Sequence, residues 1–498
     1  MKKYILLIFL FPFISFSQAP NLQWQKSFGG SEFDVANAVV ATSDGGIVFA
    51  GETNSAYGDT GANNNGKFNL WIVKVDAAGA IQWQKPLGGT KNDKAYSVIE
   101  TNDLGFIVAG FTSSNDNNVT LNKGNSDYWI IKFSSSGVIE WQKTYGGSGS
   151  EEAYTIQQTE DSGYIIAGVT NSTDGDITNA KGDQDYWIIK LNSSGDLIWQ
   201  KIFGGTQTDQ PSKLLVTKDG GCIITGRTNS INGDVTNTSL GYCGWIVKLN
   251  NSGDIEWEKC FENAVMAIQY IPNLDQYVVI GYGEGLGGDS WIAKIDNSGT
   301  VIWQTIYGGS GYELARAVAL TTDEGFLTCG VTYSADGDIT NYKGNGDFWL
   351  VKFDKSGQLE WEKTFGGSGG DIPYAMTLSA SGEIILAGST TSTDGDITDV
   401  KGKSDVWIIK LETETLQNES FNNDLSALYP NPVSNSLNLT FSNSNQEKQI
   451  LIFDVNGKIV FNKSQKSNTV VVENLTKGTY IIQIKIGSQN YISKFIKK

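Results

Sequence analysis

Acidic residues recur in this chain at a spacing that could bind a hard cation. Three segments read Asp-Gly-Asp-Ile-Thr, and each is followed by an aspartate at the twelfth position counted from its first residue. Alternate oxygen ligands with a carboxylate at position twelve suit Ca²⁺, which takes six to eight oxygen ligands. The carboxylates that would bind it are Asp174, Asp176, Asp185, Asp336, Asp338, Asp347, Asp394, Asp396 and Asp405.

The same residues have a second interpretation. The segments lack a glycine at position six and an apolar residue at position eight, so they are not EF-hand loops. Asp-Gly pairs make turns, and an aspartate in a turn commonly bonds to nearby backbone groups. In other copies the pattern weakens to Asn232-Gly233-Asp234, or to Asp59 alone. Both interpretations stay open, and Ca²⁺ is the only cofactor that the sequence suggests.

Other residue types narrow the chemistry further. The chain contains no histidine, which excludes Ser-His-Asp and Cys-His nucleophilic sites and His-ligated metals. Carboxylate pairs are frequent, so the residue types alone leave glycoside hydrolysis open. A catalytic site, however, usually needs one unique constellation, and these acids recur in near-identical copies. We therefore expect a protein that is not an enzyme.

A repeat positions these acids, and it contains all 14 tryptophans. Each copy has one Trp in a Trp-Ile/Leu-x-Lys segment and a second, twelve residues later, in a Trp-Gln/Glu-Lys/Thr segment. Within each set the tryptophans follow at 58 residues, apart from one spacing of 59 at the start and a spacing of 46 in the fifth copy. A period of this size is typical of propellers and repeat arrays. The first set is Trp71, Trp129, Trp187, Trp245, Trp291, Trp349 and Trp407, and the second is Trp24, Trp83, Trp141, Trp199, Trp257, Trp303 and Trp361.

Each copy contains four short apolar runs, which in the third copy are 153–159, 163–170, 186–191 and 197–203. They are rich in Ile, Val, Tyr, Trp and Thr and are bounded by turn residues, as expected for strands, and none has helical periodicity. Four antiparallel strands make one propeller blade. The repeats begin with a lone Trp-Gln segment and end on a lone Trp-Ile segment. The sequence thus predicts an all-β, seven-bladed β-propeller over 18–415, whose N-terminal strand completes the last blade.

The blade topology predicts which loops share a face. With strands named a to d, the a–b and c–d turns lie at one end, and the b–c loops lie at the other end with the d–a links between blades. The long loops, 173–185, 336–347 and 394–405, are all b–c loops. Binding sites tend to lie on loops held by a rigid scaffold, so we expect the b–c end to be the binding face. In the fifth copy only 281–290 remains of the b–c loop, which leaves a notch in the rim where a unique site could lie. The paired tryptophans are expected to be core residues.

The N-terminal end and the cysteines suggest export without a disulfide. Residues 1–17 are two lysines and an apolar run that ends in small residues, which is typical of a secretory signal peptide. No other segment is long and apolar enough to span a membrane, so we expect none in the mature form. Cys243 and Cys260 lie on neighbouring predicted strands, but their positions relative to Trp245 and Trp257 place them on opposite faces. We therefore expect no disulfide.

Charge and composition divide the chain into two parts. A polar segment without pattern, 416–426, reads as a linker to a region, 427–498, that has no Trp and more basic than acidic residues. The formal net charge of the chain is −17. Because the C-terminal region is basic, this negative charge must come from the repeats. An acidic ring should repel nucleic acid and anionic membranes. We expect no nucleic-acid partner.

Six short strand-like runs in 427–498 predict a small Ig-like β-sandwich. This region contains Tyr429-Pro430-Asn431-Pro432, a Leu475–Tyr480 segment reading Leu-Thr-Lys-Gly-Thr-Tyr, and a Lys-Phe-Ile-Lys-Lys ending. In these motifs it resembles the type A C-terminal sorting domain of the type IX secretion system. The resemblance implies export by the signal peptide and then, through the type IX secretion machinery, across the outer membrane. The sorting residues that it implies are Tyr429, Pro430, Asn431, Pro432, Gly478, Tyr480, Lys497 and Lys498.

The repeats also resemble bacterial β-propeller repeats of secreted and surface proteins, through their Gly-Gly, Asp-Gly-Gly and Trp-x-x-Lys landmarks. The sequence therefore predicts a secreted or outer-membrane cell-surface protein. Its propeller would bind a glycan or a surface protein through the b–c loops, without catalysis. Two alternatives stay open. One is a hydrolase or lyase acting on polysaccharides, which a single deep pocket breaking the sevenfold symmetry would favour, and the other is a structural module without a ligand.

Overall fold

The computed structural model describes residues 19–61, 67–236, 241–283, 288–414, 427–440, 447–454, 458–486 and 489–498. The chain divides into two compact units, one of which is Ala19–Glu414 and the other of which contains the C-terminal region. Every regular element in the described residues is a β-strand. Among those residues, no helix is long and apolar enough to cross a membrane. The predicted signal peptide, 1–17, and the predicted linker, 416–426, lie outside the described residues.

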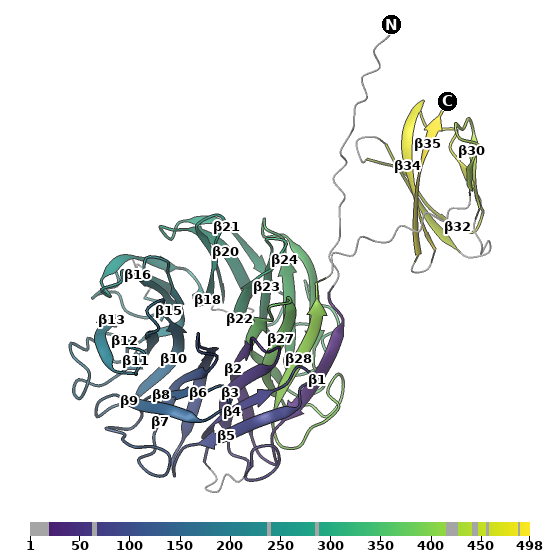
Figure 1. The fold of residues 1–498 in the computed structure, drawn as a ribbon. Coiled ribbons are helices and arrows are strands. Elements are labelled where there is room, and N and C mark those ends of the chain that lie inside the picture. Colours follow the sequence, from purple (N-terminus) through teal and green to yellow (C-terminus); the bar gives the residue numbers. More distant parts are fainter. Residues whose placement is uncertain are drawn as a thin grey trace. The chain divides into compact units, whose positions relative to one another are not determined.

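The first unit consists of seven four-stranded antiparallel sheets around a common centre (Figure 1). We call the sheets blades 1 to 7 and name their strands a to d outward from the centre. In that order they are β2 (Asp34–Ala41), β3 (Ile47–Thr53), β4 (Asn69–Val75), β5 (Ile81–Leu87); β6 (Asp93–Glu100), β7 (Phe106–Thr112), β8 (Asp127–Phe133), β9 (Ile139–Tyr145); β10 (Glu151–Gln158), β11 (Tyr164–Thr170), β12 (Asp185–Leu191), β13 (Leu197–Phe203); β14 (Asp209–Val216), β15 (Cys222–Thr228), β16 (Cys243–Leu249), β17 (Ile255–Phe261); β18 (Ala264–Ile271), β19 (Gln276–Tyr282), β20 (Ser290–Asp296), β21 (Val301–Tyr307); β22 (Glu313–Leu320), β23 (Phe326–Thr332), β24 (Asp347–Phe353), β25 (Leu359–Phe365); and β26 (Asp371–Leu378), β27 (Glu383–Thr390), β28 (Asp405–Thr413), β1 (Leu22–Phe28).

The ring closes through its first strand. β1 pairs antiparallel with β28, so the N-terminal strand is the outer strand of blade 7. Blade 7 then packs on blade 1, and Ile385 and Ile408 share a buried cluster with Phe49 and Trp71. An open ring would leave unpaired strand edges that could pair with other chains. The predicted all-β, seven-bladed propeller is confirmed.

The two tryptophans of each repeat face opposite sides of their blade. In blade 2, Trp129 lies opposite Thr144 and Trp141 lies opposite Lys132, three positions further along the same strand pair. Trp129 is buried, and its indole N–H donates to Oε1 of Gln142 at 2.8 Å. Trp141 instead packs towards blade 3, with its ring 6.0 Å from that of Tyr164. Because successive residues of a strand alternate faces, one Trp stabilises each face of the blade.

The expectation of no disulfide is wrong. Cys243 and Cys260 are joined, and their Cα atoms lie 5.5 Å apart. The parity argument assumed that Trp245 and Trp257 point to the same face, whereas Cys260 lies directly opposite Trp245 in the sheet. Cys243 is two residues from Trp245, so both sulfur atoms lie on the Trp245 face, as a diagonal cross-strand pair.

The C-terminal unit is a small sandwich, as predicted. Its core contains Leu437 and Val470 from one sheet and Ile450, Ile482 and Phe495 from the other. Both sheets are antiparallel, and their strands alternate buried and exposed residues as expected for two packed layers. The sheets are β29 (Ala427–Tyr429), β30 (Ser436–Thr440), β33 (Thr469–Val471); and β32 (Ile459–Gln465), β31 (Lys448–Phe453), β34 (Gly478–Ile486), β35 (Gln489–Lys497).

Candidate functional site

The Asp-Gly-Asp segments hold the backbone of the links between blades. In blade 3, Oδ1 of Asp174 accepts the N–H of Ser148 at 2.7 Å, and Oδ2 of Asp176 accepts the N–H of Gly146 at 3.0 Å. The Nζ atom of Lys123 also contacts Asp176. Hydrogen bonding by Ser148 lowers the pKa of Asp174. The same bonds recur for Asp336 with Ser310, Asp338 with Gly308, Asp394 with Ser368, and Asp396 with Gly366.

The aspartates at the twelfth position lie deeper, at the start of strand c. Asp185, Asp347 and Asp405 are fully buried. In Asp185, Oδ2 accepts the backbone N–H of Lys181 at 2.7 Å, whereas Oδ1 has no hydrogen-bond partner among the described residues. Burial, together with the neighbouring carboxylates, raises the pKa of Asp347 and of Asp405 to about 6. The two aspartates of each Asp-Gly-Asp segment therefore bond the link between blades, whereas the aspartate at the twelfth position bonds the backbone of its own loop.

Ca²⁺ binding by these loops stays a prediction. Within the described part of the chain, no group of three or more His, Cys, Asp or Glu side chains is arranged to hold a metal ion. A cation at Asp174 or Asp176 would compete with the backbone donors that these carboxylates already accept. We therefore expect calorimetric melting of the full chain to give the same midpoint in Ca²⁺ and in EDTA. A clear rise with Ca²⁺ would contradict this, because a ligand of the folded state alone raises the midpoint.

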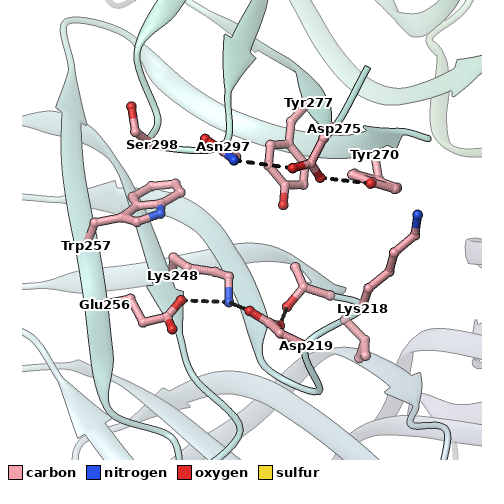
Figure 2. A pocket seen from close by; sticks show the side chains of 12 residues that line it. Lys218, Asp219, Lys248, Glu256, Trp257, Tyr270, Asp275, Tyr277, Asn297 and Ser298 are labelled. Carbon is pink, nitrogen blue, oxygen red and sulfur yellow. Dashed lines mark hydrogen bonds and ion pairs between the residues drawn. The ribbon is translucent and has the colours of Figure 1, made fainter. Parts of the chain in front are cut away.

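A cavity of about 480 Å³ lies between blades 4 and 5, at the end that bears the a–b and c–d turns. Strand d of blade 4 contributes Trp257 and Glu256, and the a–b hairpin of blade 5 contributes Tyr270, Asp275 and Tyr277. Figure 2 shows these side chains facing one open space from both blades. The larger of the two cavities described here thus lies at the end opposite to the predicted binding face.

The residue near the end of strand a differs between the blade junctions. Where blade 2 meets blade 1, Glu100 accepts the N–H of Ser43 in the preceding a–b turn at 3.0 Å, and Gln158 does the same with Asn102 at 2.9 Å. At the blade 4–5 junction the equivalent residue is Tyr270. Its ring lies under the Nζ atom of Lys218, 5.0 Å from the ring centre. The junction is therefore bridged by an aromatic ring rather than closed by a hydrogen bond.

The fifth a–b turn also departs from the other copies. It reads Ile-Pro-Asn-Leu-Asp-Gln over 271–276 and lacks the Thr-x-Asp pattern that five of the other six turns carry. Asp275 consequently bonds outward, accepting the hydroxyl of Tyr270 at 2.9 Å and the side-chain amide of Asn297 at 3.2 Å. The altered a–b turn is visible in the sequence, but the prediction for the fifth copy named only its short b–c loop.

Charged groups line the blade 4 wall of the cavity. The Nζ atom of Lys248 lies 2.7 Å from Asp219 and 3.0 Å from Glu256. Partial burial alone would raise the pKa of Asp219, but hydrogen bonds from Lys248 and Thr217 lower it to about 2. Asp219 is therefore ionised across the physiological pH range and is held in place by the lysine.

The indole N–H groups of the second tryptophan set are bonded at some junctions and not at others. Trp24 donates to the carbonyl oxygen of Ala77 at 3.0 Å and Trp83 to that of Ser135 at 3.3 Å, whereas the indole N–H of Trp199 has no acceptor among the described residues. For Trp257 no acceptor lies within hydrogen-bonding geometry among the described residues. The indole still packs on Gly299, where a Cβ would lie 3.0 Å from the ring. Trp257 thus offers the cavity both a ring edge and an open donor (Figure 2).

The sorting residues predicted at the C-terminus lie in the second unit. Asn431 joins the two ends of this unit, because its amide donates to the carbonyl oxygen of Lys494 at 3.1 Å and accepts the N–H of Ile496 at 2.9 Å. The hydroxyl of Tyr480 donates to the carbonyl oxygen of Thr476 at 2.8 Å, and its ring stacks on Phe495. Gly478 and Lys497 pair across β34 and β35. Tyr429 and Pro430 are exposed, as are Pro432 and Lys498.

Comparison with known proteins agrees with this division. Residues 427–498 match the family described as the secretion system C-terminal sorting domain. A curated relative, the regulatory protein FlaEY of Caulobacter vibrioides, is 22% identical over 189 residues, which is 34% of this chain and only 20% of that protein.

Solved structures resemble the chain at low identity. PorZ, a surface component of the type-IX secretion system of Porphyromonas gingivalis, is 11% identical with a TM-score of 0.41, covering 95% of this chain and 60% of PorZ. The extracellular domain of the hybrid two-component system BT3049 of B. thetaiotaomicron is 12% identical with a TM-score of 0.42, covering 97% and 58%. The periplasmic gluconolactonase of Pseudomonas aeruginosa is 9% identical with a TM-score of 0.42, covering 73% and 99%. The chain spans about three fifths of the first two structures.

The match at the C-terminus, the motifs that carry it and the sandwich that they form assign the second unit. The chain is a β-propeller followed by a type IX secretion system C-terminal sorting domain.

Proposed function

We propose that the propeller is a non-catalytic, exported binding protein that takes a sugar residue of a glycan in the cavity between blades 4 and 5. The observation that carries this proposal is the set of three aromatic side chains, Trp257, Tyr270 and Tyr277, beside polar groups in one cavity. The volume of about 480 Å³ falls within the roughly 300–1,000 Å³ of ordinary ligand pockets.

The chemistry of a sugar fits both parts of this lining. An aromatic ring offers a flat apolar surface with a polar tip, and the C–H face of a pyranose is a flat apolar partner. Sugar hydroxyls need donors and acceptors at the rim. Asn297 and Asp275 supply an amide and a carboxylate on one side, and Glu256 supplies a carboxylate on the other. The open indole N–H of Trp257 is a further donor.

A polysaccharide hydrolase is the alternative that a symmetry-breaking cavity was expected to favour. Glycoside hydrolysis requires one carboxylic acid that holds a proton for the leaving group. Asp219 does not meet this requirement, because hydrogen bonds from Lys248 and Thr217 lower its pKa to about 2. Glu256 lies against the same lysine. These contacts support a binding role, and reducing-end assays on a polysaccharide panel test the alternative directly.

We expect Trp257→Ala to weaken glycan binding at least tenfold, since loss of an aromatic anchor commonly costs about 2 kcal/mol. The measurement is binding of the full chain to a glycan array, followed by calorimetric titration with the best neutral oligosaccharide. Trp83→Ala is the matched control. Trp83 occupies the same place between blades 1 and 2 and packs in an equivalent cluster, so its loss should cost similar stability without affecting binding.

Two results would contradict the proposal. One is equal loss of binding in Trp257→Ala and Trp83→Ala, which would indicate a general loss of structure. The other is unchanged binding in Trp257→Ala, which would place the glycan elsewhere on the propeller.

A further inference from the structure

A second, smaller cavity lies at the b–c end of blade 4. Its volume is about 230 Å³, and it is lined by Thr208, Gln210, Arg227, Asn229 and Tyr242. Thr208 belongs to the d–a link before blade 4, Arg227 lies near the end of strand b, and Asn229 and Tyr242 belong to the b–c loop. Every lining side chain can form hydrogen bonds, and none is aliphatic.

A glycine lies next to Arg227 in the sheet and lets the next blade approach closely. In the sheet, Arg227 lies between Gln210 of strand a and Gly244 of strand c. A Cβ at Gly244 would lie 2.0 Å from the carbonyl oxygen of Asn263, so the next blade approaches too closely for any side chain here. The other six blades carry larger residues at the Gly244 position, namely Leu70, Tyr128, Tyr186, Ser290, Phe348 and Val406.

Arg227 forms no ion pair with a carboxylate in the part of the chain that the structure describes. The chain has only two arginines. Nε and Nη2 of Arg227 both donate to Oε1 of Gln210, at 3.0 and 2.5 Å, and Gln210 is held in turn by Gln184 at 2.7 Å. No ion pair joins Arg227 to an acidic residue that the structure describes. By contrast, the same strand-b position of blade 1 is Glu52, which pairs with Lys94 at 2.6 Å.

We propose that this cavity binds the acidic group of a charged sugar, a carboxylate or a sulfate ester, at the guanidinium of Arg227. Guanidinium carries five N–H donors in a planar fork and binds such oxyanions through two parallel hydrogen bonds. Gln210 occupies one edge of the fork and fixes its orientation, which leaves the other N–H groups for a ligand. Asn229 and Thr208 can then bond the sugar hydroxyls.

The lining favours a glycan over an acidic peptide. The cavity is smaller than the roughly 300–1,000 Å³ of typical ligand pockets, so it fits a single sugar ring or a terminal group. Amide and hydroxyl groups match the alternating hydroxyls of a sugar, whereas a peptide would need an apolar pocket for its neighbouring side chains. This inference rests on the proposed function only in that the ligand is a glycan. The cavity itself lies at the other end of the propeller.

The test is calorimetric titration of the full chain with an oligogalacturonate and with the methyl ester of the same oligosaccharide. A heparin-derived oligosaccharide distinguishes sulfate from carboxylate. We expect the acid to bind and its methyl ester to bind at least tenfold more weakly, because a charge-assisted hydrogen bond contributes about 1.5–3 kcal/mol. Arg227→Met should show the same loss, and Arg227→Lys a smaller one, because lysine keeps the charge but not the fork.

Trp257→Ala separates this inference from the proposed function, because it should leave binding of the acidic oligosaccharide unchanged. Melting midpoints of all variants confirm that they fold. Equal affinity for the acid and its ester, or full affinity in a folded Arg227→Met variant, would overturn the inference. Arg227-dependent binding of an acidic peptide in place of both acidic oligosaccharides would also overturn it.

Discussion

Deleting the last strand, residues 489–498, should keep the protein inside the cell envelope. β35 pairs with β34 along its whole length and supplies Phe495, which is fully buried in the core of the sorting domain. Its removal exposes the edge of β34 and leaves a large cavity, and deletion of a buried Phe side chain alone commonly costs about 3–5 kcal/mol. The measurement is immunoblotting of periplasmic, surface and medium fractions in a host with a type IX secretion system.

Asn431→Ala tests the same idea without removing chain. Asn431 holds the Tyr429–Pro432 segment to the last strand through two hydrogen bonds, so we expect partial retention. Asn462→Ala, at an exposed position outside the predicted sorting residues, is the matched control and should be exported normally. Export of the deletion variant at the parent level would show that the sorting domain is not required.

The repeat pattern predicted the architecture because every copy must bury the apolar faces of the same four strands. Seven copies of the same alternating strands leave few ways to bury their apolar faces, and the unmatched first and last strands require each other. It was harder to predict which side chains of neighbouring strands c and d point to the same face of a blade. The register between Trp245 and Trp257 includes an irregularity at Lys248 and Leu249, and this places Cys260 on the side of Cys243.

The candidate sites were predicted less well, because each depends on departures from the repeat rather than on the repeat. Tyr270 and Gly244 differ from their counterparts in ways visible in the sequence. The cavities beside them, however, also depend on which residues of the neighbouring blade line them. The Asp-Gly-Asp segments show a different limit of the sequence. Their spacing suits a cation, but the donors that they bind are backbone N–H groups of Gly146 and Ser148, which no motif reveals.

Buried carboxyl groups face one another at several blade junctions. At the junction of blades 2 and 3, a Cβ placed on Gly146 would lie 2.3 Å from Oδ1 of Asp127 and 2.8 Å from Oε2 of Glu151. Glu151 accepts the N–H of Gly147 and the hydroxyl of Thr170, both at 2.8 Å. Oδ1 of Asp127 has no hydrogen-bond partner among the described residues. A proton on Asp127 would remove the repulsion between the two carboxylates.

The direction of the pH effect follows from the pKa of Asp127. Burial, and then the charges of Glu151 and Asp176, raise this pKa to about 6 against the hydrogen bond from the N–H of Lys123. An unfolded aspartate has a pKa of about 3.9. Between these values the folded state binds the extra proton, so this group stabilises the fold at low pH. Its contribution falls as pH rises from about 4 to about 6 and is lost above that range.

Blade 1 shows what removing this charge would do, because Asn69 occupies the position of Asp127 and faces Asp93. We therefore expect Asp127→Asn to stabilise the propeller above pH 6 by about 1–2 kcal/mol, less than a two-unit pKa shift would give because of solvent screening. The gain should vanish towards pH 4. The reverse substitution, Asn69→Asp, should destabilise the fold above pH 6. Melting midpoints of the full chain from pH 4 to 8 measure both effects. A lower midpoint for Asp127→Asn at pH 7.5 would show that the junction needs the anion, as it would if a cation were bound between Asp127 and Glu151.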